Sequence, residues 1–169
     1  DGHTSKEYEF KIGCEAHINA LLRNLHSNSD LLAHVVYFCL NLENIQRTLI
    51  PENLISLYRL KENLKNKLEY ENLHSLLIEY TKGDDYKYFM AWGNHTKHWS
   101  NISAQLTYNL KGPDENIYSW NFEEFTYRKG VYPKQSVLLF IEREYDRQSK
   151  LLPQIIREID LLSAELLEN

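Results

Sequence analysis

The residues whose types and spacing suit chemistry lie in the segment 92–99, which reads Trp-Gly-Asn-His-Thr-Lys-His-Trp. The apolar pattern around it predicts a helix, and on a helix His95 and His98 are about one turn apart, so both can reach the same point. Asn94 and Lys97 flank them. Amide and ammonium groups can orient or neutralise a phosphate, so the segment suits acid–base chemistry on a phosphodiester.

In this hypothesis His98 transfers the proton and Lys97 contacts the phosphate, while His95 and Asn94 complete the candidate catalytic site.

The alternative is a structural role for the segment. His98 and Trp99 would then begin the packing against a following sheet, and His95 and Lys97 would be solvated. Residue types and spacing leave both interpretations open.

A metal site is a second chemical interpretation, because the spacing of His95 and His98 also suits two metal ligands. Asp84, Asp85 or His74 could complete the set. The Glu-x-x-His pair that di-iron bundles need on two helices occurs only once in the chain. We therefore expect no metal and no other cofactor, and we find no Gly-rich phosphate loop and no Gly-x-Ser-x-Gly motif.

Apolar residues spaced three and four apart predict the helices that position this segment. The expected helices cover about 8–25, 30–49, 51–68, 70–80 and 85–99, with Asn28-Ser29-Asp30 separating the first two. The side chains of the first two helices that we expect to face the core are Phe10, Cys14, Ile18, Leu21, Leu22, Leu25, Leu31, Val35, Phe38, Cys39, Leu42, Ile45 and Leu49.

From residue 102 the apolar period changes to two, which predicts a strand over 102–110. An aromatic strand is expected over 118–127, although its alternation slips at Glu123-Glu124. A short third strand is expected at Val131-Tyr132 after the turn at Lys129-Gly130. These strands predict a small antiparallel sheet.

After Pro133 a long helix is expected up to Leu166, with a kink or a break near Leu151 because Pro153 lies inside it. The predicted fold class is mainly α: a helical bundle of about five helices with a small antiparallel β-sheet inserted before the long C-terminal helix. We expect a single helical domain over 7–169 with the β insertion at about 102–132. Residues 1–6 are expected to form a disordered or vector-derived tail.

Composition narrows the function classes. The 169-residue chain carries a formal net charge of −5, which argues against broad electrostatic capture of nucleic acid and requires any such binding to be local. Its richest apolar stretch, 31–42, is too short to span a bilayer, so we expect no membrane association. Cys14 and Cys39 lie on predicted apolar faces and are expected to be reduced core thiols of a cytoplasmic protein.

The segment resembles the HEPN group of helical domains, many of which are RNases of defence and toxin systems. In that group a helix carries an arginine, a polar residue, a few spacers and a histidine; here Asn94 to His98 resembles the polar residue through to the histidine. The arginine's place falls on Gly93. The resemblance covers about residues 51–101, and in active members arginine and histidine from two protomers meet at a dimer interface. It implies either an inactive binding version or a site in which Lys97 supplies the charge.

We therefore expect a HEPN-like module that binds RNA or a nucleotide phosphate, in a bacterial defence or toxin-related setting and as a possible homodimer. If the protein is an enzyme, it is expected to be a metal-independent ribonuclease. The alternative is a protein-interaction or structural helical-bundle protein without catalysis, because the aromatic strand over 119–132 has an interface-like composition. The final helix also has a heptad-like seam that could pair with a second copy.

Overall fold

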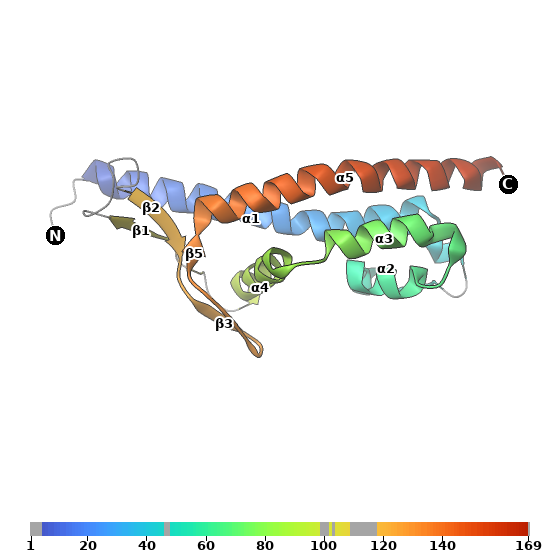
Figure 1. Ribbon diagram of the computed structural model, residues 1–169, viewed down its shortest axis with the longest axis horizontal. Coiled ribbons are helices and arrows are strands. Elements are labelled where there is room, and N and C mark those ends of the chain that lie inside the picture. Colours follow the sequence, from blue (N-terminus) through green and yellow to red (C-terminus); the bar gives the residue numbers. More distant parts are fainter. Residues whose placement is uncertain (1–4, 46–47, 99–101, 103, 109–117, 169) are drawn as a thin grey trace. The chain divides into compact units, whose positions relative to one another are not determined.

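The computed structural model describes residues 5–45, 48–98, 102, 104–108 and 118–168. Within them the chain is mainly helical, with five α-helices and a small antiparallel sheet before the long C-terminal helix, which confirms the expected fold class (Figure 1). The helices are α1 (Ser5–Cys39), α2 (Leu57–Leu64), α3 (Glu71–Tyr80), α4 (Asp84–His98) and α5 (Val137–Glu168). The strands are β1 (Ala104–Tyr108), β2 (Tyr118–Phe122), β3 (Phe125–Tyr127), β4 (Gly130–Tyr132) and β5 (Gln135–Ser136).

The chain divides into two compact units. Unit 1 comprises Asp1–Asn24 and Asp84–Glu144, and unit 2 comprises Leu25–Gly83 and Tyr145–Asn169. Helices α1 and α5 contribute residues to both units. Ser5 and Lys6, which we expected in a terminal tail, are the first residues of α1, whereas residues 1–4 lie outside the described part of the chain.

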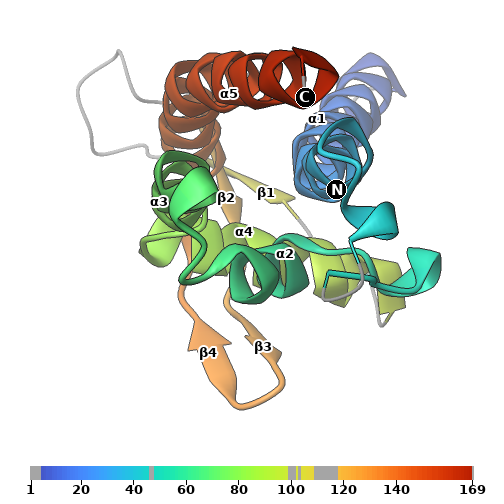
Figure 2. The same cartoon turned by 90° about the vertical axis from the view of Figure 1, so that its right-hand side faces the viewer.

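The sheet of unit 1 has β2 at its centre, paired antiparallel with β1 on one side and β5 on the other. Strands β3 and β4 form a separate hairpin in which Phe125 lies opposite Tyr132 (Figure 2). The loop residue Arg128 has a φ of 53°, in the left-handed region that tight hairpin turns require. The single strand expected over 118–127 is wrong, because β2 and β3 are separate strands of different sheets. The break between them falls at Glu123–Glu124, where the alternation slips.

Aromatic side chains form the core of unit 1. Phe89 and Trp92 of α4, Phe122 of β2 and Phe140 of α5 are each 0% exposed. The rings of Trp92 and Phe122 lie 6.1 Å apart, and Phe140 meets Phe122 edge-on at 6.0 Å. Such pairs contribute about 0.5–1.5 kcal/mol each beyond the burial of apolar area. They fix α4 and the start of α5 against the sheet.

Unit 2 contains α2 and α3, which present their buried residues at helical spacing. Ser56 caps α2 by accepting a hydrogen bond from the backbone N–H of Arg59 at 3.4 Å. The helix that we expected over 51–68 is shorter than predicted, because Glu52–Leu54 is a 3₁₀ turn and α2 begins only after the cap. Leu68, the last residue of the expected helix, is 85% exposed.

In unit 2 the end of α1 and the body of α5 lie side by side and run in the same direction (Figure 1). The Asn28 side-chain amide donates to Gln148 Oε1 at 3.1 Å, and eleven residues later the carbonyl of Cys39 accepts from Ser163 Oγ at 3.1 Å. Buried Leu32, Val36 and Ile155 belong to the core of this unit.

The predicted break at Asn28-Ser29-Asp30 is wrong, because α1 continues through it. Polar side chains can compete with helical hydrogen bonds, but here Asn28 bonds to Gln148 and Ser29 is buried at 3% exposure. In an uninterrupted helix the angular positions of the side chains continue without a change of phase. The side buried at Leu22 and Leu25 therefore continues through the following residues: Ser29, Leu32, Ala33, Val36 and Leu40.

This fixed phase also corrects the expected inner face. Leu31, Val35 and Phe38 were expected inside, but they are 62%, 39% and 48% exposed. At the other end of α1, Phe10 is 67% exposed, so that expectation is wrong as well. Cys14 and Cys39 are both free thiols, but Cys39 is exposed rather than in the core.

The break expected near Leu151 does not occur, since α5 is a single helix with Pro153 inside it. Proline removes one backbone N–H donor and crowds the preceding turn, but Pro153 is exposed. The buried residues after it, Ile155, Ile159 and Leu162, hold the second half of the helix in the core of unit 2.

We expect Pro153→Ala to raise the free energy of unfolding by about 1–3 kcal/mol, because it restores the missing hydrogen bond at an exposed position. Urea unfolding followed by circular dichroism measures the change. Arg157→Ala, an exposed change one turn later, is the control and should stay within about 0.5 kcal/mol of the wild type. Equal or lower stability of the Pro153 variant would show that the helix requires proline geometry there.

Candidate functional site

The segment 94–98 forms the last turn of α4. Asp84 and Asp85 in the first turn complement the helix dipole. Trp92 turns to the core, and at 100° per residue Asn94 and Lys97 lie on the opposite side of the helix. Asn94 is half-buried and Lys97 is exposed.

His95 lies against the hairpin. Its ring meets Phe125 of β3 at 5.6 Å and 67°, and Phe125 in turn stacks on Tyr132 at 4.9 Å and 13°. The half-buried His95 therefore packs on the hairpin, so the structural interpretation, which expected His95 to be solvated, is wrong for this residue. The His98 side chain and Trp99 lie outside the described part, so roles predicted for them stay predictions.

The position that corresponds to the arginine of the HEPN motif is occupied by Gly93, and Gly93 is buried in α4. Its carbonyl accepts a hydrogen bond from Thr96 Oγ1 at 3.0 Å. A long cationic side chain at this position would meet the interior of unit 1 instead of solvent. Lys97, which the resemblance offers as a substitute, is exposed one turn further along.

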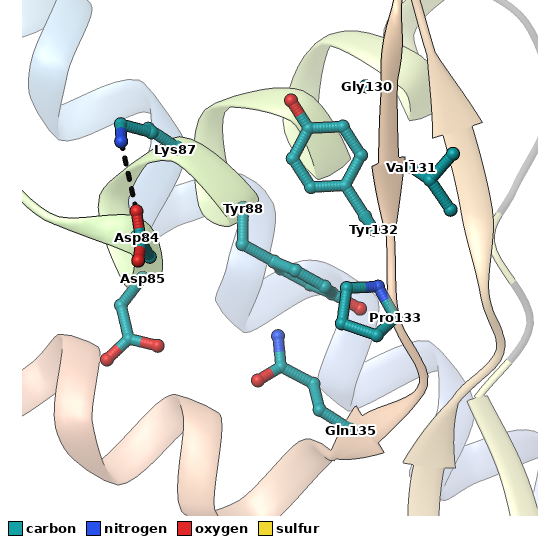
Figure 3. A pocket seen from close by; sticks show the side chains of 9 residues that line it. All are labelled: Asp84, Asp85, Lys87, Tyr88, Gly130, Val131, Tyr132, Pro133 and Gln135. Atoms are coloured by element: carbon teal, nitrogen blue, oxygen red, sulfur yellow. Dashed lines mark hydrogen bonds and ion pairs between the residues drawn. The ribbon is translucent and has the colours of Figure 1, made fainter.

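A pocket of about 470 Å³ lies elsewhere in unit 1, between the first turns of α4 and strands β4 and β5 (Figure 3). We call it the Tyr88 pocket. It is lined by Asp84, Asp85, Lys87, Tyr88, Gly130, Val131, Tyr132, Pro133 and Gln135. Sequence reasoning missed it, because Asp84 and Asp85 signal a helix start and the tyrosines signal a core. Packing of the Tyr88 ring against Phe125 and Tyr132 of the hairpin brings residues 84–88 and 130–135 together.

The two carboxylates of the pocket differ in their electrostatic surroundings. Arg143 donates two hydrogen bonds of 2.8 Å to Asp85 and a third of 3.2 Å to Gln135 Oε1. The hydrogen bonds to Asp85 raise the pKa of Arg143, so its guanidinium stays charged. Asp84 is 97% exposed and has an exposed Lys87 at 3.0 Å, a weak surface pair. The Asp84 carboxylate is therefore accessible.

The Tyr88 hydroxyl is the most deeply buried polar group of the pocket lining. Tyr88 is 5% exposed, and no described residue forms a hydrogen bond of 3.5 Å or less with its oxygen. Burial raises the pKa of Tyr88 to about 12, and a weaker polar interaction with the Gln135 amide, outside ordinary hydrogen-bond geometry, opposes this rise. The group stays protonated under physiological conditions.

Comparison of the chain with known protein families, with curated proteins and with solved structures finds no match.

Two further findings concern ligands and membranes. Among the described side chains, no group of three or more His, Cys, Asp or Glu residues is arranged to hold a metal ion. The metal hypothesis for His95 and His98 is not covered by this finding, because the His98 side chain lies outside the described part of the chain. No described helix is both long enough and apolar enough to cross a membrane.

Tyr88→Phe should leave stability unchanged or slightly higher at pH 8, because it removes a buried hydroxyl that has no close partner. In the wild type, the unfolded chain loses the Tyr88 proton near pH 10 and the folded chain only near pH 12. Stability therefore falls as the pH rises through this window. At pH 11 this tyrosine should cost the wild type about 1 kcal/mol relative to Tyr88→Phe, after allowance for solvent screening.

Urea unfolding of both proteins at pH 8 and pH 11 measures this difference. The other tyrosines and lysines are common to both proteins and cancel. An equal alkaline loss in the two proteins would show that the hydroxyl is solvated in the folded state.

Proposed function

We propose that this protein is a non-catalytic interaction module that pairs with a second copy of itself through one face of α1. The observation that carries the proposal is the exposure of three apolar side chains near the C-terminal end of this helix. We call Leu31, Val35 and Phe38 the α1 stripe.

The α1 stripe lies on one face of the helix, because its residues are spaced four and three apart. They are 62%, 39% and 48% exposed, while Leu32 and Val36 beside them are buried. A helix that is apolar on nearly all sides is normally covered on all sides. Clustered exposed apolar residues mark interaction surfaces more often than scattered ones do.

The charge of this segment favours a second copy as the partner. Between Leu25 and Cys39 the only acidic or basic residue is Asp30, apart from two histidines. Two copies can therefore meet without bringing like charges together. A strongly basic or acidic partner would find no complementary group on this face.

The order of the side chains along the α1 stripe also suits pairing with a second, antiparallel copy of the same stripe. A two-fold axis between His34 and Val35 places Leu31 of one copy opposite Phe38 of the other, with the smaller Val35 near the axis. Ring nitrogen Nδ1 of His34 lies 2.8 Å from the carbonyl oxygen of Asp30, which holds the imidazole along the helix. Three side chains per copy are far fewer than a standard interface contains, so we expect a weak dimer with a Kd of about 1–100 µM.

Val35→Asp should convert the protein to a monomer, because two carboxylates would meet near the axis without a partner. Sedimentation equilibrium from 5 to 500 µM, concentrations chosen around the order-of-magnitude Kd, measures the association. Val35 is partly exposed, so the variant should keep the circular dichroism spectrum of the wild type. Leu161→Asp, at a 55% exposed leucine on α5, is the matched control and should still dimerise.

A wild-type protein that remains monomeric at every concentration would contradict the proposal. So would a dimer that Val35→Asp leaves intact, because another surface would then form it.

A second candidate is RNA binding through unit 1, and exposed cations of the hairpin favour it. Arg128 and Lys129 occupy its two-residue loop, and the guanidinium of Arg128 lies 5.3 Å from the ring of Tyr127. Contact between His95 and Phe125 joins this hairpin to the last turn of α4, where Lys97 is exposed. Such cations can contact a phosphate backbone without reading sequence.

The double reversal Arg128→Glu with Lys129→Glu should weaken binding of a fluorescent single-stranded RNA about tenfold or more at low salt. Fluorescence anisotropy measures it, with Lys82→Glu, an exposed lysine of unit 2, as the control. No binding by the wild type would remove this candidate. RNA cleavage by the wild type but not by His98→Ala would overturn the non-catalytic proposal.

A further inference from the structure

We propose that the Tyr88 pocket is a binding site for an organic cation, a guanidinium or alkylammonium group on a short apolar stem. The pocket belongs entirely to unit 1, and the inference does not depend on the α1 stripe.

Two tyrosines from different elements form the walls of the pocket. Tyr88 extends from α4 and Tyr132 from β4, and their rings are nearly perpendicular, 5.8 Å apart and at 82° (Figure 3). Phe125 stacks on Tyr132 and supports it. Aromatic faces at such a site attract a cation through their quadrupoles.

Gly130 allows Tyr132 to take this position. A Cβ atom at residue 130 would lie 2.9 Å from Cε2 of Tyr132 and 3.0 Å from its hydroxyl oxygen. Any side chain there would displace the ring. The short strand β4 thus combines a glycine and a tyrosine so that an aromatic wall can lie across it.

The polar groups of the lining are mainly hydrogen-bond acceptors. Asp84 offers an accessible carboxylate, and Asp85 adds a second that Arg143 holds in place. The single cation of the lining is Lys87, 69% exposed and flexible. An anionic ligand would meet two carboxylates, and a neutral apolar ligand would gain no interaction from either of them.

The buried Tyr88 hydroxyl points independently to a ligand. Tyr88 as a whole is 95% buried, the complement of its 5% exposure, and its hydroxyl lies at the pocket wall beside Pro133 without a close hydrogen-bond partner (Figure 3). A buried polar group without a partner costs stability, and a phenylalanine would fill the same space without this cost. An N–H group of a bound cation would supply the missing partner. The volume of about 470 Å³ lies in the usual range for small-ligand sites.

The test titrates the full-length protein with two guanidinium probes and follows backbone amide shifts by NMR. n-Butylguanidine carries the head and stem alone, whereas Nα-acetyl-arginine amide carries the same head on a peptide unit. We expect saturable shifts at residues 84–88 and 130–135 with at least one probe. Binding of both indicates a free small cation as ligand, and binding of the arginine amide alone indicates a side chain of a partner protein.

Nα-Acetyl-citrulline amide, the neutral isostere of the arginine probe, should bind at least about tenfold more weakly.

Asp84→Asn should weaken binding about fivefold or more, because the neutral amide keeps the size but loses the charge. Glu79→Gln is its matched control, since Glu79 forms the same kind of exposed pair, with Lys82 three residues on, in unit 2. Tyr88→Phe should weaken binding about threefold or more while the protein stays as stable as the wild type at pH 8.

Equal affinity for the citrulline and arginine probes would overturn the inference. Unchanged affinity in Asp84→Asn would also overturn it, as would the absence of saturable shifts with both guanidinium probes.

Discussion

The packing of one side of α1 is the constraint on which most of this account depends. Between Leu31 and Leu40 the helix is apolar on nearly every side, but unit 2 covers only the side that carries Leu32, Val36 and Leu40. Burial of that side builds the core with α5, and Asn28 of the continuous helix donates a hydrogen bond to Gln148 of α5. The opposite apolar side is left exposed as a consequence. A single helical phase thus explains both the core of unit 2 and the surface that we propose for self-association.

Much of the fold could be predicted from local patterns. The two-residue period after Ile102, the slip at Glu123-Glu124 and the apolar spacing of α3 and α5 describe each element by its own residues, and the structure has those elements. The wrong predictions concern positions whose structure depends on residues far away in the sequence. Asn28 was expected to end a helix, but its side chain bonds to Gln148, 120 residues away. A helix that is wrongly broken at Asn28 also receives the wrong buried face for every later residue of α1. Pro153 predicted a break from its own chemistry, but packing of the residues after it keeps α5 a single helix.

The candidate site was predictable only in part. Spacing correctly placed Asn94 to His98 on one helical turn, but nothing local could show that His95 packs on Phe125, 30 residues further along the chain, or that Gly93 is buried. Local sequence also concealed the Tyr88 pocket, because Asp84 is ordinary at a helix start and Tyr132 is ordinary in a strand. Its chemistry arises from the approach of β4 to the start of α4. The unpartnered hydroxyl of Tyr88 breaks a rule of stable cores, and such departures are expected at functional positions.

The most direct test of the central claim is an isotope-filtered NOE spectrum of a sample in which half of the protein is labelled with ¹³C and ¹⁵N. This experiment detects only contacts between different copies of the chain. The account predicts intermolecular NOEs between Leu31 of one copy and Phe38 of the other, together with NOEs between the Val35 methyl groups of the two copies. Intermolecular NOEs confined to other surfaces, or their absence in a sample shown to be dimeric, would contradict the claim that the α1 stripe pairs two copies.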